Sequence, residues 1–308
     1  MKQRSGLVDP ELEREFRLND GRLILYREYG ATDGEVILAL HGTPGSGLKY
    51  RPAHEAAGIR GLRIIAPDRW GYGASQAPRI RSLRHYSHDM SEFMQEVGAP
   101  TFSVVGISGG GPFAAALAAE MPARVHKLAL VAPVGQIAEK NSSKADIYAK
   151  YPVRQFHRFC FLGLPRLPGA TRGIFWLYRL AMIAAPASAV KIAITRSSKP
   201  DKRTMSSAES RRALGQTFAA GLRNGVSGPV IDLNMFAADW DFDIGKICCD
   251  TRLWIGEDDL NVPIGSVLAL ARDITGAQIS LMREQGHFWI SENFGDVLEW
   301  LGKDNVKA

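Results

Sequence analysis

The chain has 308 residues, of which 45% are hydrophobic and 23% are charged. This composition is typical of a globular protein with a large apolar core and excludes a disordered chain. The formal net charge of +6 is not accompanied by interleaved aromatic residues or a nucleic-acid-binding motif, so we expect no nucleic-acid partner. Three cysteines without metal-ligand spacing, and no apolar signal-peptide stretch in residues 1–15, lead us to expect a cytoplasmic protein with no metal or cofactor.

Short apolar runs alternate with helical stretches in the first and last parts of the chain. Residues 15–29 predict a hairpin, because Asn19-Asp20-Gly21 separates two strand-like runs. Further strands are expected at 36–40, 62–66, 101–107, 127–132, 251–255 and 278–282, and helices at 86–97, 110–120, 264–274 and 289–301. Strands that alternate with helices require crossover connections, which predicts an α/β fold with a mostly parallel central sheet flanked by helices.

Residues 136–235 lack a clear strand pattern and contain several helical stretches. The helices are expected at 157–164, 173–183 and 209–222. We therefore predict one discontinuous core domain, residues 1–135 and 236–308, interrupted by a helical insertion at 136–235. Residues 173–190 approach the length of a membrane span, but Arg179 interrupts them, so we expect no stable membrane insertion.

The sequence Gly-Ile-Ser-Gly-Gly at 106–110 matches the pattern Gly-x-Ser-x-Gly between a predicted strand and a predicted helix. In this context the pattern positions a nucleophilic serine, here Ser108; a phosphate-binding turn is the alternative. The turn must strain the serine backbone, and Gly106 and Gly110 lack the side chains that would collide with the strand and the helix. The backbone N–H of Gly109 is the expected first donor to an oxyanion, and a second is expected from the loop after the strand at 36–40.

A serine nucleophile needs a base, and histidine has the appropriate pKa. Of the seven histidines, only His287 follows a late strand on a loop able to reach the carboxyl edge of the sheet. Four others are expected in helices or at helix edges: His54, His85, His88 and His126. The carboxylate partner of the imidazole is expected in the loop after the strand at 251–255, where Glu257, Asp258 and Asp259 leave the choice open.

Five stretches of sequence together resemble the α/β-hydrolase superfamily over nearly the whole chain. They are HGTPGS at 41–46, APDRWGYGAS at 66–75, GISGGG at 106–111, WIGEDDLNVP at 254–263 and QGHF at 285–288. The resemblance implies that Asp259 is the acid of a Ser-His-Asp triad, that Thr43 is the second oxyanion donor and that Asp68 is structural. It also implies that the insertion is a helical cap over the active site.

The implied activity is hydrolysis of a carboxylic ester or lactone of a small molecule through an acyl-enzyme at Ser108. Six aromatic residues of the insertion favour an apolar or aromatic acyl group, unless they only pack the cap onto the core: Phe156, Phe159, Phe161, Phe175, Trp176 and Tyr178. Alternatives are a proline iminopeptidase-like aminopeptidase, a carbon–carbon bond hydrolase and a non-enzymatic ligand receptor. The aminopeptidase would need acidic insertion residues to bind a substrate amine, for which Glu139, Asp146 and Glu209 are available. No sequence feature indicates an oligomeric state.

Overall fold

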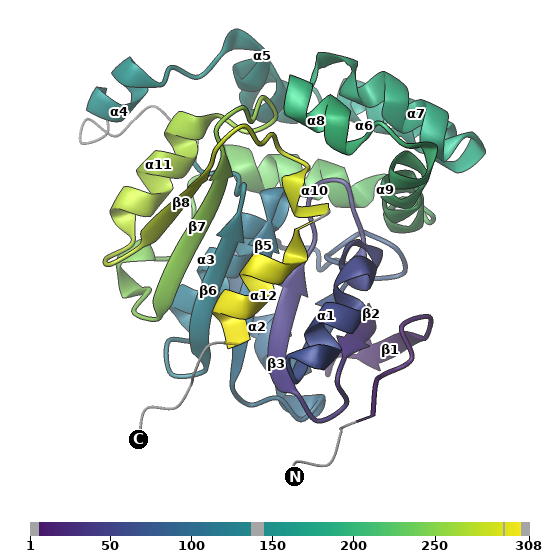
Figure 1. Ribbon diagram of the computed structural model, residues 1–308, viewed down its shortest axis with the longest axis vertical. Helices are drawn as coiled ribbons and strands as arrows, with labels where there is room; N and C mark the ends of the chain where they lie inside the picture. The colour runs from purple at the N-terminus through teal and green to yellow at the C-terminus, as the bar shows by residue number, and fades with distance from the viewer. Residues whose placement is uncertain (1–5, 137–144, 292, 303–308) are drawn as a thin grey trace.

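The computed structural model describes residues 6–136, 145–291 and 293–302. Its centre is a sheet of eight strands in the order β1-β2-β4-β3-β5-β6-β7-β8 (Figure 1). The strands are β1 Glu13–Arg17, β2 Leu23–Gly30, β3 Glu35–Leu40, β4 Leu62–Pro67, β5 Phe102–Ile107, β6 Val125–Val131, β7 Asp250–Gly256 and β8 Gln278–Met282. β1 and β2 form the predicted hairpin, β2 is antiparallel to β4, and the remaining neighbours pair in parallel. The predicted α/β fold and all of its predicted strands are confirmed.

Helices cover both faces of this sheet. Figure 1 shows α1 and α12 in front of the sheet and α2 and α3 behind it. The flanking α-helices are α1 His54–Ile59, α2 Leu83–Glu96, α3 Gly111–Glu120, α11 Ile264–Asp273 and α12 Phe294–Gly302. Short 3-10 turns connect several elements: η1 Gly47–Ala53, η2 Ser108–Gly110, η7 Ile244–Lys246 and η8 Trp289–Ser291.

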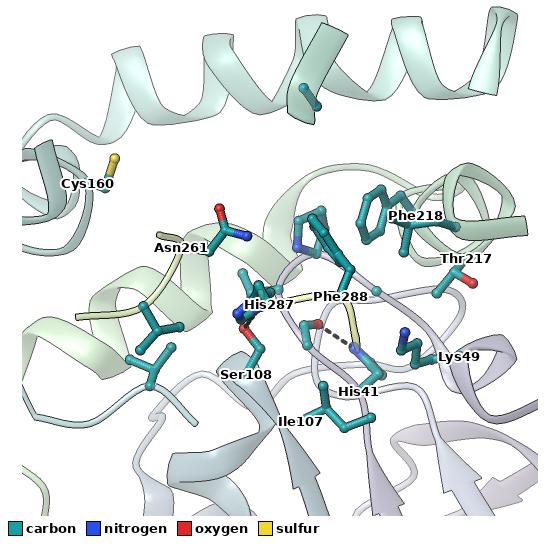
Figure 2. Close-up of a pocket in the computed structure, with 18 of the residues that line it drawn as sticks. His41, Lys49, Ile107, Ser108, Cys160, Thr217, Phe218, Asn261, His287 and Phe288 are labelled. Atoms are coloured by element: carbon teal, nitrogen blue, oxygen red, sulfur yellow. Dashed lines mark hydrogen bonds between the residues drawn. The ribbon is translucent and has the colours of Figure 1, made fainter. Parts of the chain in front are cut away.

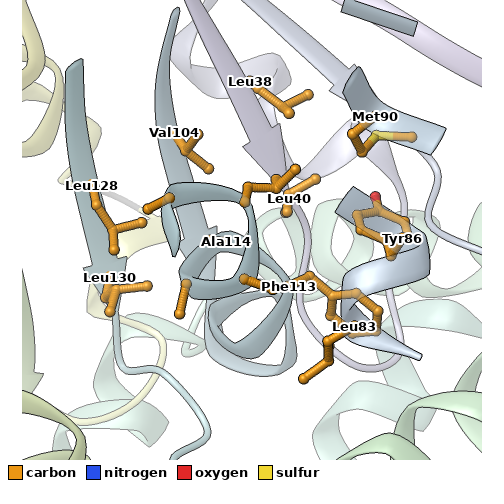
Figure 3. Close-up of a cluster of buried hydrophobic side chains, with 14 of the residues drawn as sticks. Leu38, Leu40, Leu83, Tyr86, Met90, Val104, Phe113, Ala114, Leu128 and Leu130 are labelled. Atoms are coloured by element: carbon orange, nitrogen blue, oxygen red, sulfur yellow. The ribbon is translucent and has the colours of Figure 1, made fainter. Parts of the chain in front are cut away.

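Alternate side chains of the central strands build one core on each face of the sheet. Leu38 and Leu40 of β3 pack with α2 and α3, whereas Ile37 and Ala39 pack with α1 and α12. Figure 3 shows the first of these cores, where leucines of β3 and β6 lie around α3 and Phe113 of that helix lies beside Tyr86 of α2. Because both faces are buried, these strands are almost continuous apolar runs, and this is why the sequence pattern reveals them.

A run of helices connects β6 to β7. They are α4 Ala145–Lys150, α5 Gln155–Arg158, η4 Phe159–Gly163, η5 Leu164–Arg166, α6 Pro168–Ala184, α7 Pro186–Ala193, η6 Ile194–Arg196, α8 Lys199–Thr204, α9 Ala208–Gly221 and α10 Ser227–Ala237. We call residues 145–237 the helical segment; none of these described residues forms a strand. Figure 1 shows α5, α6, α7 and α8 together at the top of the molecule.

Three local predictions are wrong. The expected helix at 157–164 is instead the end of α5 followed by a π-helical turn and a 3-10 turn, because Pro165 cannot donate the hydrogen bond that a continuing helix needs. The closing helix α12 begins at Phe294 and not at Trp289, because the chain first closes the turn η8. His126 lies exposed in β6 and not in or beside a helix, since that strand begins two residues before the predicted start at 127.

The apolar stretch at 173–190 is divided between two helices. α6 ends at Ala184, and Pro186 begins α7, where its missing N–H has little cost. Within the described ranges, we find no helix that combines the length and the apolar composition required to cross a membrane.

Candidate active site

Ser108 lies at the turn from β5 into α3, and its backbone has a φ of 52°. This left-handed conformation is strained for a residue with a side chain and lifts the hydroxyl above the end of the strand. A Cβ on Gly106 would lie 2.6 Å from the Cβ of Ala114, and a Cβ on Gly110 would lie 2.4 Å from the carbonyl oxygen of Leu40. The turn therefore has room only for glycine at these two positions, as the sequence pattern predicts.

The structure brings Ser108, His287 and Asp259 together in a hydrogen-bonded row. Nε2 of His287 lies 3.1 Å from Oγ of Ser108, and Nδ1 lies 2.7 Å from Oδ2 of Asp259. Figure 2 shows the His287 ring directly above the Ser108 side chain. Oδ1 of Asp259 accepts two backbone N–H groups of its own loop, at 2.7 and 3.1 Å, which holds the carboxylate in place. Of the acids that the residue pattern alone left open, Glu257 and Asp258 are exposed, and only Asp259 contacts the imidazole.

His287 is the histidine that contacts Ser108, although His41 also lines the neighbouring cavity. His41 is fully buried, and its two ring nitrogens are occupied by the backbone N–H of Arg69 at 3.0 Å and the carbonyl of Gly42 at 2.8 Å. Burial lowers the pKa of His41, so its ring is neutral. We therefore assign His41 a structural part in shaping its loop.

Charged groups on three elements shift the pKa of His287. Burial is the largest single effect and lowers this pKa, but the charge and hydrogen bond of Asp259, together with the charge of Asp201, leave the pKa above the ordinary value. Asp201 of α8 adds a second negative charge; its own pKa is raised by burial, and its Oδ1 accepts the backbone N–H of Phe288 at 2.8 Å. Lys49 of η1 opposes these carboxylates, and burial lowers the pKa of Lys49 to about 8.

A buried ion pair holds the loop that follows β3. Arg69 donates to Asp232 of α10 from Nη1 at 2.5 Å and from Nη2 at 2.8 Å, and both side chains are almost inaccessible to solvent. The hydroxyls of Thr43 and Tyr72 donate to the same carboxylate at 2.5 and 2.6 Å. A Cβ on Gly109 would lie 2.0 Å from the Thr43 hydroxyl oxygen. The network therefore fixes Thr43 directly against the residue that follows Ser108.

Two backbone N–H groups are available beside the serine. In the described part of the chain, the N–H of Thr43 forms no hydrogen bond. The N–H of Gly109 lies in the first turn after β5, where N–H groups have no partner within the helix. Gly42 allows the loop after β3 to lie close to Ser108, because a Cβ at position 42 would lie 3.2 Å from the Cβ of Ser108.

Ser108 and His287 open into a cavity of about 340 Å³ between the sheet and the helical segment. Its wall is mostly apolar and contains six aromatic residues: Phe161, Phe175, Tyr178, Phe218, Phe236 and Phe288. Apart from the two histidines, Lys49 is the only ionisable basic residue among the described lining residues, and none of them is acidic. A mostly apolar pocket with a few converging polar groups is typical of a small-molecule site.

Comparison with known proteins identifies the family of this chain. A match to the alpha/beta hydrolase fold family extends over residues 35–294. The chain belongs to the α/β-hydrolase family. A non-heme chloroperoxidase from Streptomyces lividans is 32% identical over 136 residues, which are 42% of this chain and 47% of that protein.

A second curated relative and a solved structure are also similar to the chain. A bifunctional esterase/perhydrolase from Acinetobacter calcoaceticus is 31% identical over 129 residues, covering 41% of this chain and 47% of that protein. The chain thus spans about half the length of each of these two curated relatives. The crystal structure of a bromoperoxidase from Bacillus anthracis superposes with a TM-score of 0.70 at 18% identity, covering 95% of this chain and 100% of that one.

The six aromatic residues predicted to matter in the insertion of this α/β-hydrolase divide into two groups. Three line the cavity: Phe161, Phe175 and Tyr178. The other three are exposed, by 56%, 53% and 49% of their surface: Phe156, Phe159 and Trp176. For the three exposed residues, both the expected contact with an acyl group and the expected packing on the core are wrong, because these side chains neither line the cavity nor pack on the core.

The acidic residues considered for binding an amine do not line this cavity. Asp146 is exposed and pairs with Arg272 of α11 at 2.9 Å. Glu209 lines a separate cavity, and Glu139 lies outside the described residues.

Sequence reasoning missed four charged residues around the site. Arg69 stands in the stretch 66–75, where only Asp68 received a role; that aspartate is indeed buried and accepts the backbone N–H of Gly47 at 2.7 Å. Asp232 is the one charged residue in the mostly apolar helix α10, which is a sign of a buried partner. We find no comparable sequence signal for Asp201 or Lys49, because only the packing of elements far apart in the chain brings their charges near His287.

Proposed function

We propose that this α/β-hydrolase is a serine hydrolase that cleaves a carboxylic ester or lactone with an apolar or aromatic acyl group. The observation that carries the proposal is the row from Asp259 through His287 to Ser108, with the serine hydroxyl at the floor of a mostly apolar cavity. In this proposal the helical segment acts as a cap, since it supplies Phe161, Phe175 and other lining residues.

The proposed reaction has two steps. His287 accepts the proton of Ser108 while Oγ attacks the substrate carbonyl, and the oxyanion is bound by the N–H groups of Thr43 and Gly109. His287 then gives the proton to the departing alcohol, leaving an acyl-enzyme. Water, deprotonated by His287, attacks the acyl carbon, the bond to Oγ of Ser108 breaks as Oγ takes the proton back from His287, and the carboxylic acid is released. Asp259 stays ionised and stabilises the imidazolium.

An aminopeptidase is a weaker proposal for this site. Binding of a substrate ammonium group requires a nearby carboxylate or a ring of acceptors, whereas the described wall of the cavity contains Lys49 and no acidic residue. A cationic side chain would repel the ammonium group.

A fluorophosphonate probe and a substrate panel test the proposal. The probe should modify the native chain at Ser108, located by mass spectrometry of the peptides, and should not modify the heat-denatured chain. Among p-nitrophenyl esters, lactones and proline naphthylamide, we expect the highest kcat/KM for an ester or lactone. Absence of labelling would indicate a ligand receptor, and faster turnover of the amide would favour the aminopeptidase.

The pH dependence of kcat/KM tests the part of His287 as the base. Activity should increase with pH as the imidazole loses its proton, because only the neutral ring can accept the serine proton. Asp201→Asn removes a negative charge near the ring, so it should lower the pKa of His287 and move the acidic limb to lower pH. Lys49→Met removes a positive charge and should move the limb in the opposite direction. If both variants lose activity without moving the limb, Asp201 and Lys49 are structural only.

A further inference from the structure

The helical segment exposes an unusual amount of apolar surface. Among the described residues, fifteen large hydrophobic side chains are exposed, and nine of them fall between residues 156 and 192. The nine are Phe156, Phe159, Leu167, Ile174, Trp176, Leu177, Leu180, Ile183 and Ile192. Single exposed hydrophobic residues are normal, but a concentration of this kind marks a surface that contacts something apolar.

Helix α6 is apolar on opposite faces. One face contains Thr171 and Met182, which are buried, and Phe175 and Tyr178, which line the cavity. Trp176, Leu177, Leu180 and Ile183 project from the other side at helical spacing, and between 49% and 71% of each is exposed. A helix that is apolar all round is normally buried on all sides. The outer side of α6 therefore has the chemistry of a contact surface.

The same part of the chain carries the positive charge of the protein. Residues 154–212 contain twelve lysines and arginines and only two acidic residues, Asp201 and Glu209. The remaining 249 residues contain 26 basic and 30 acidic residues. Asp201 is buried, so Glu209 is the only exposed acid in this stretch. Ten of the twelve basic residues are exposed, among them Arg172 in α6 and Lys191 in α7.

We propose that this face of the helical segment binds the surface of a membrane that contains anionic lipids. Exposed Trp and Leu side chains on a helix that also exposes Arg172, followed by a helix that exposes Lys191, are the features of an interfacial helix, which buries its apolar side among the acyl chains near the head groups. The basic residues then lie at the level of the anionic head groups.

Charge argues against a second copy of the chain as the occupant. A two-fold dimer through this face would place the same patch of each protomer against the other. The exposed arginines and lysines of the two protomers would then face one another, with only Glu209 of this stretch available to neutralise them. An anionic lipid surface instead neutralises them.

Membrane contact would also place the cavity near apolar compounds. Phe175 and Tyr178 project from the cavity side of the helix whose other side would touch the lipid. This consequence for substrate supply rests on the proposed function, whereas lipid binding itself does not depend on Ser108.

Vesicle flotation with the whole chain tests the proposal. We expect the protein to float with vesicles of phosphatidylcholine and phosphatidylglycerol and to bind vesicles of phosphatidylcholine alone at least about fivefold more weakly, as the loss of one basic contact would produce. High salt should weaken binding to the mixed vesicles. The Ser108→Ala variant should bind equally well, which separates failure of this proposal from failure of the proposed function.

Matched surface variants locate the contact. Leu177 is 71% exposed and does not line the cavity, so Leu177→Asp should weaken vesicle binding about tenfold or more and leave hydrolysis of a short soluble ester unchanged. Arg172→Glu should also weaken binding to the mixed vesicles. Ile59 is 85% exposed on α1, away from α6, and Ile59→Asp should leave binding unchanged.

Three results would overturn the proposal. One is the absence of binding to mixed vesicles, and another is equal binding of the Leu177→Asp and wild-type proteins. The third is a dimer in solution that Leu177→Asp converts to a monomer without any vesicle binding by the wild type, which would assign the face to self-association.

Discussion

Replacing Ser108 by alanine should lower kcat for a p-nitrophenyl ester by about 10⁶-fold, the magnitude seen when the nucleophile of a serine hydrolase is removed. The side chain has one hydrogen-bond partner in the described structure, Nε2 of His287 at 3.1 Å, so its removal deletes the nucleophile and little else. Alanine tolerates the φ of 52° at this turn about as poorly as serine does. The thermal unfolding midpoint should therefore change little.

The matched control is Ser188→Ala, at an exposed position of α7. This variant should keep full activity and stability. Ester hydrolysis by the Ser108→Ala protein at the wild-type rate would refute the assignment of the nucleophile. Loss of both activity and cooperative unfolding would show a folding defect, and fluorophosphonate labelling of the wild-type protein would then decide the assignment.

Replacing Asp232 by alanine should lower the free energy of unfolding by about 3–5 kcal/mol, because it removes one partner of a buried ion pair. The guanidinium of Arg69 would remain in the interior without its carboxylate, with 0% of its side chain exposed. The hydroxyls of Thr43 and Tyr72 would lose the same acceptor. Urea unfolding followed by circular dichroism measures the change.

Asp146→Ala is the control for this second prediction, since it also deletes an ion-paired aspartate. Its partner Arg272 is on the surface, with 52% of its side chain exposed, and can be solvated by water when the pair is lost. The free energy of unfolding should change far less than for Asp232→Ala. Equal effects of the two substitutions would contradict the importance assigned to burial of the Arg69–Asp232 pair.

The two parts of the fold differ in how well sequence patterns predict them. Strands such as β3 and β5 are buried on both faces, so they stand out as short apolar runs bounded by turn residues. In the helical segment the pattern of apolar residues predicts the structure less well. α6 exposes apolar side chains on its outer face, and the stretch at 157–164 forms π and 3-10 turns. The apolar pattern predicts no separate helix at α4, α7, α8 or α10, although Pro186 in the first turn of α7 and the N-cap Ser198 of α8 are local signals of a helix start.

The residues of the candidate site also differ in how well the sequence predicts them. Ser108 and His287 were chosen from local context, a strand–turn–helix for one and a late loop for the other. The residue pattern left three acids possible, and only the resemblance singled out Asp259, which the structure then brings to 2.7 Å from His287.

By itself, the sequence of this α/β-hydrolase determined the strands of the sheet, the flanking helices α2, α3, α11 and α12 and the strained turn at Ser108, because these depend on neighbouring residues. Only the tertiary structure decided which charges meet around that serine. Arg69 and Asp232 are 163 residues apart in the chain, and Asp201 and Phe288 are 87 apart. Such contacts arise when helices pack across the end of the sheet, and no local pattern encodes the distance between two side chains on separate elements.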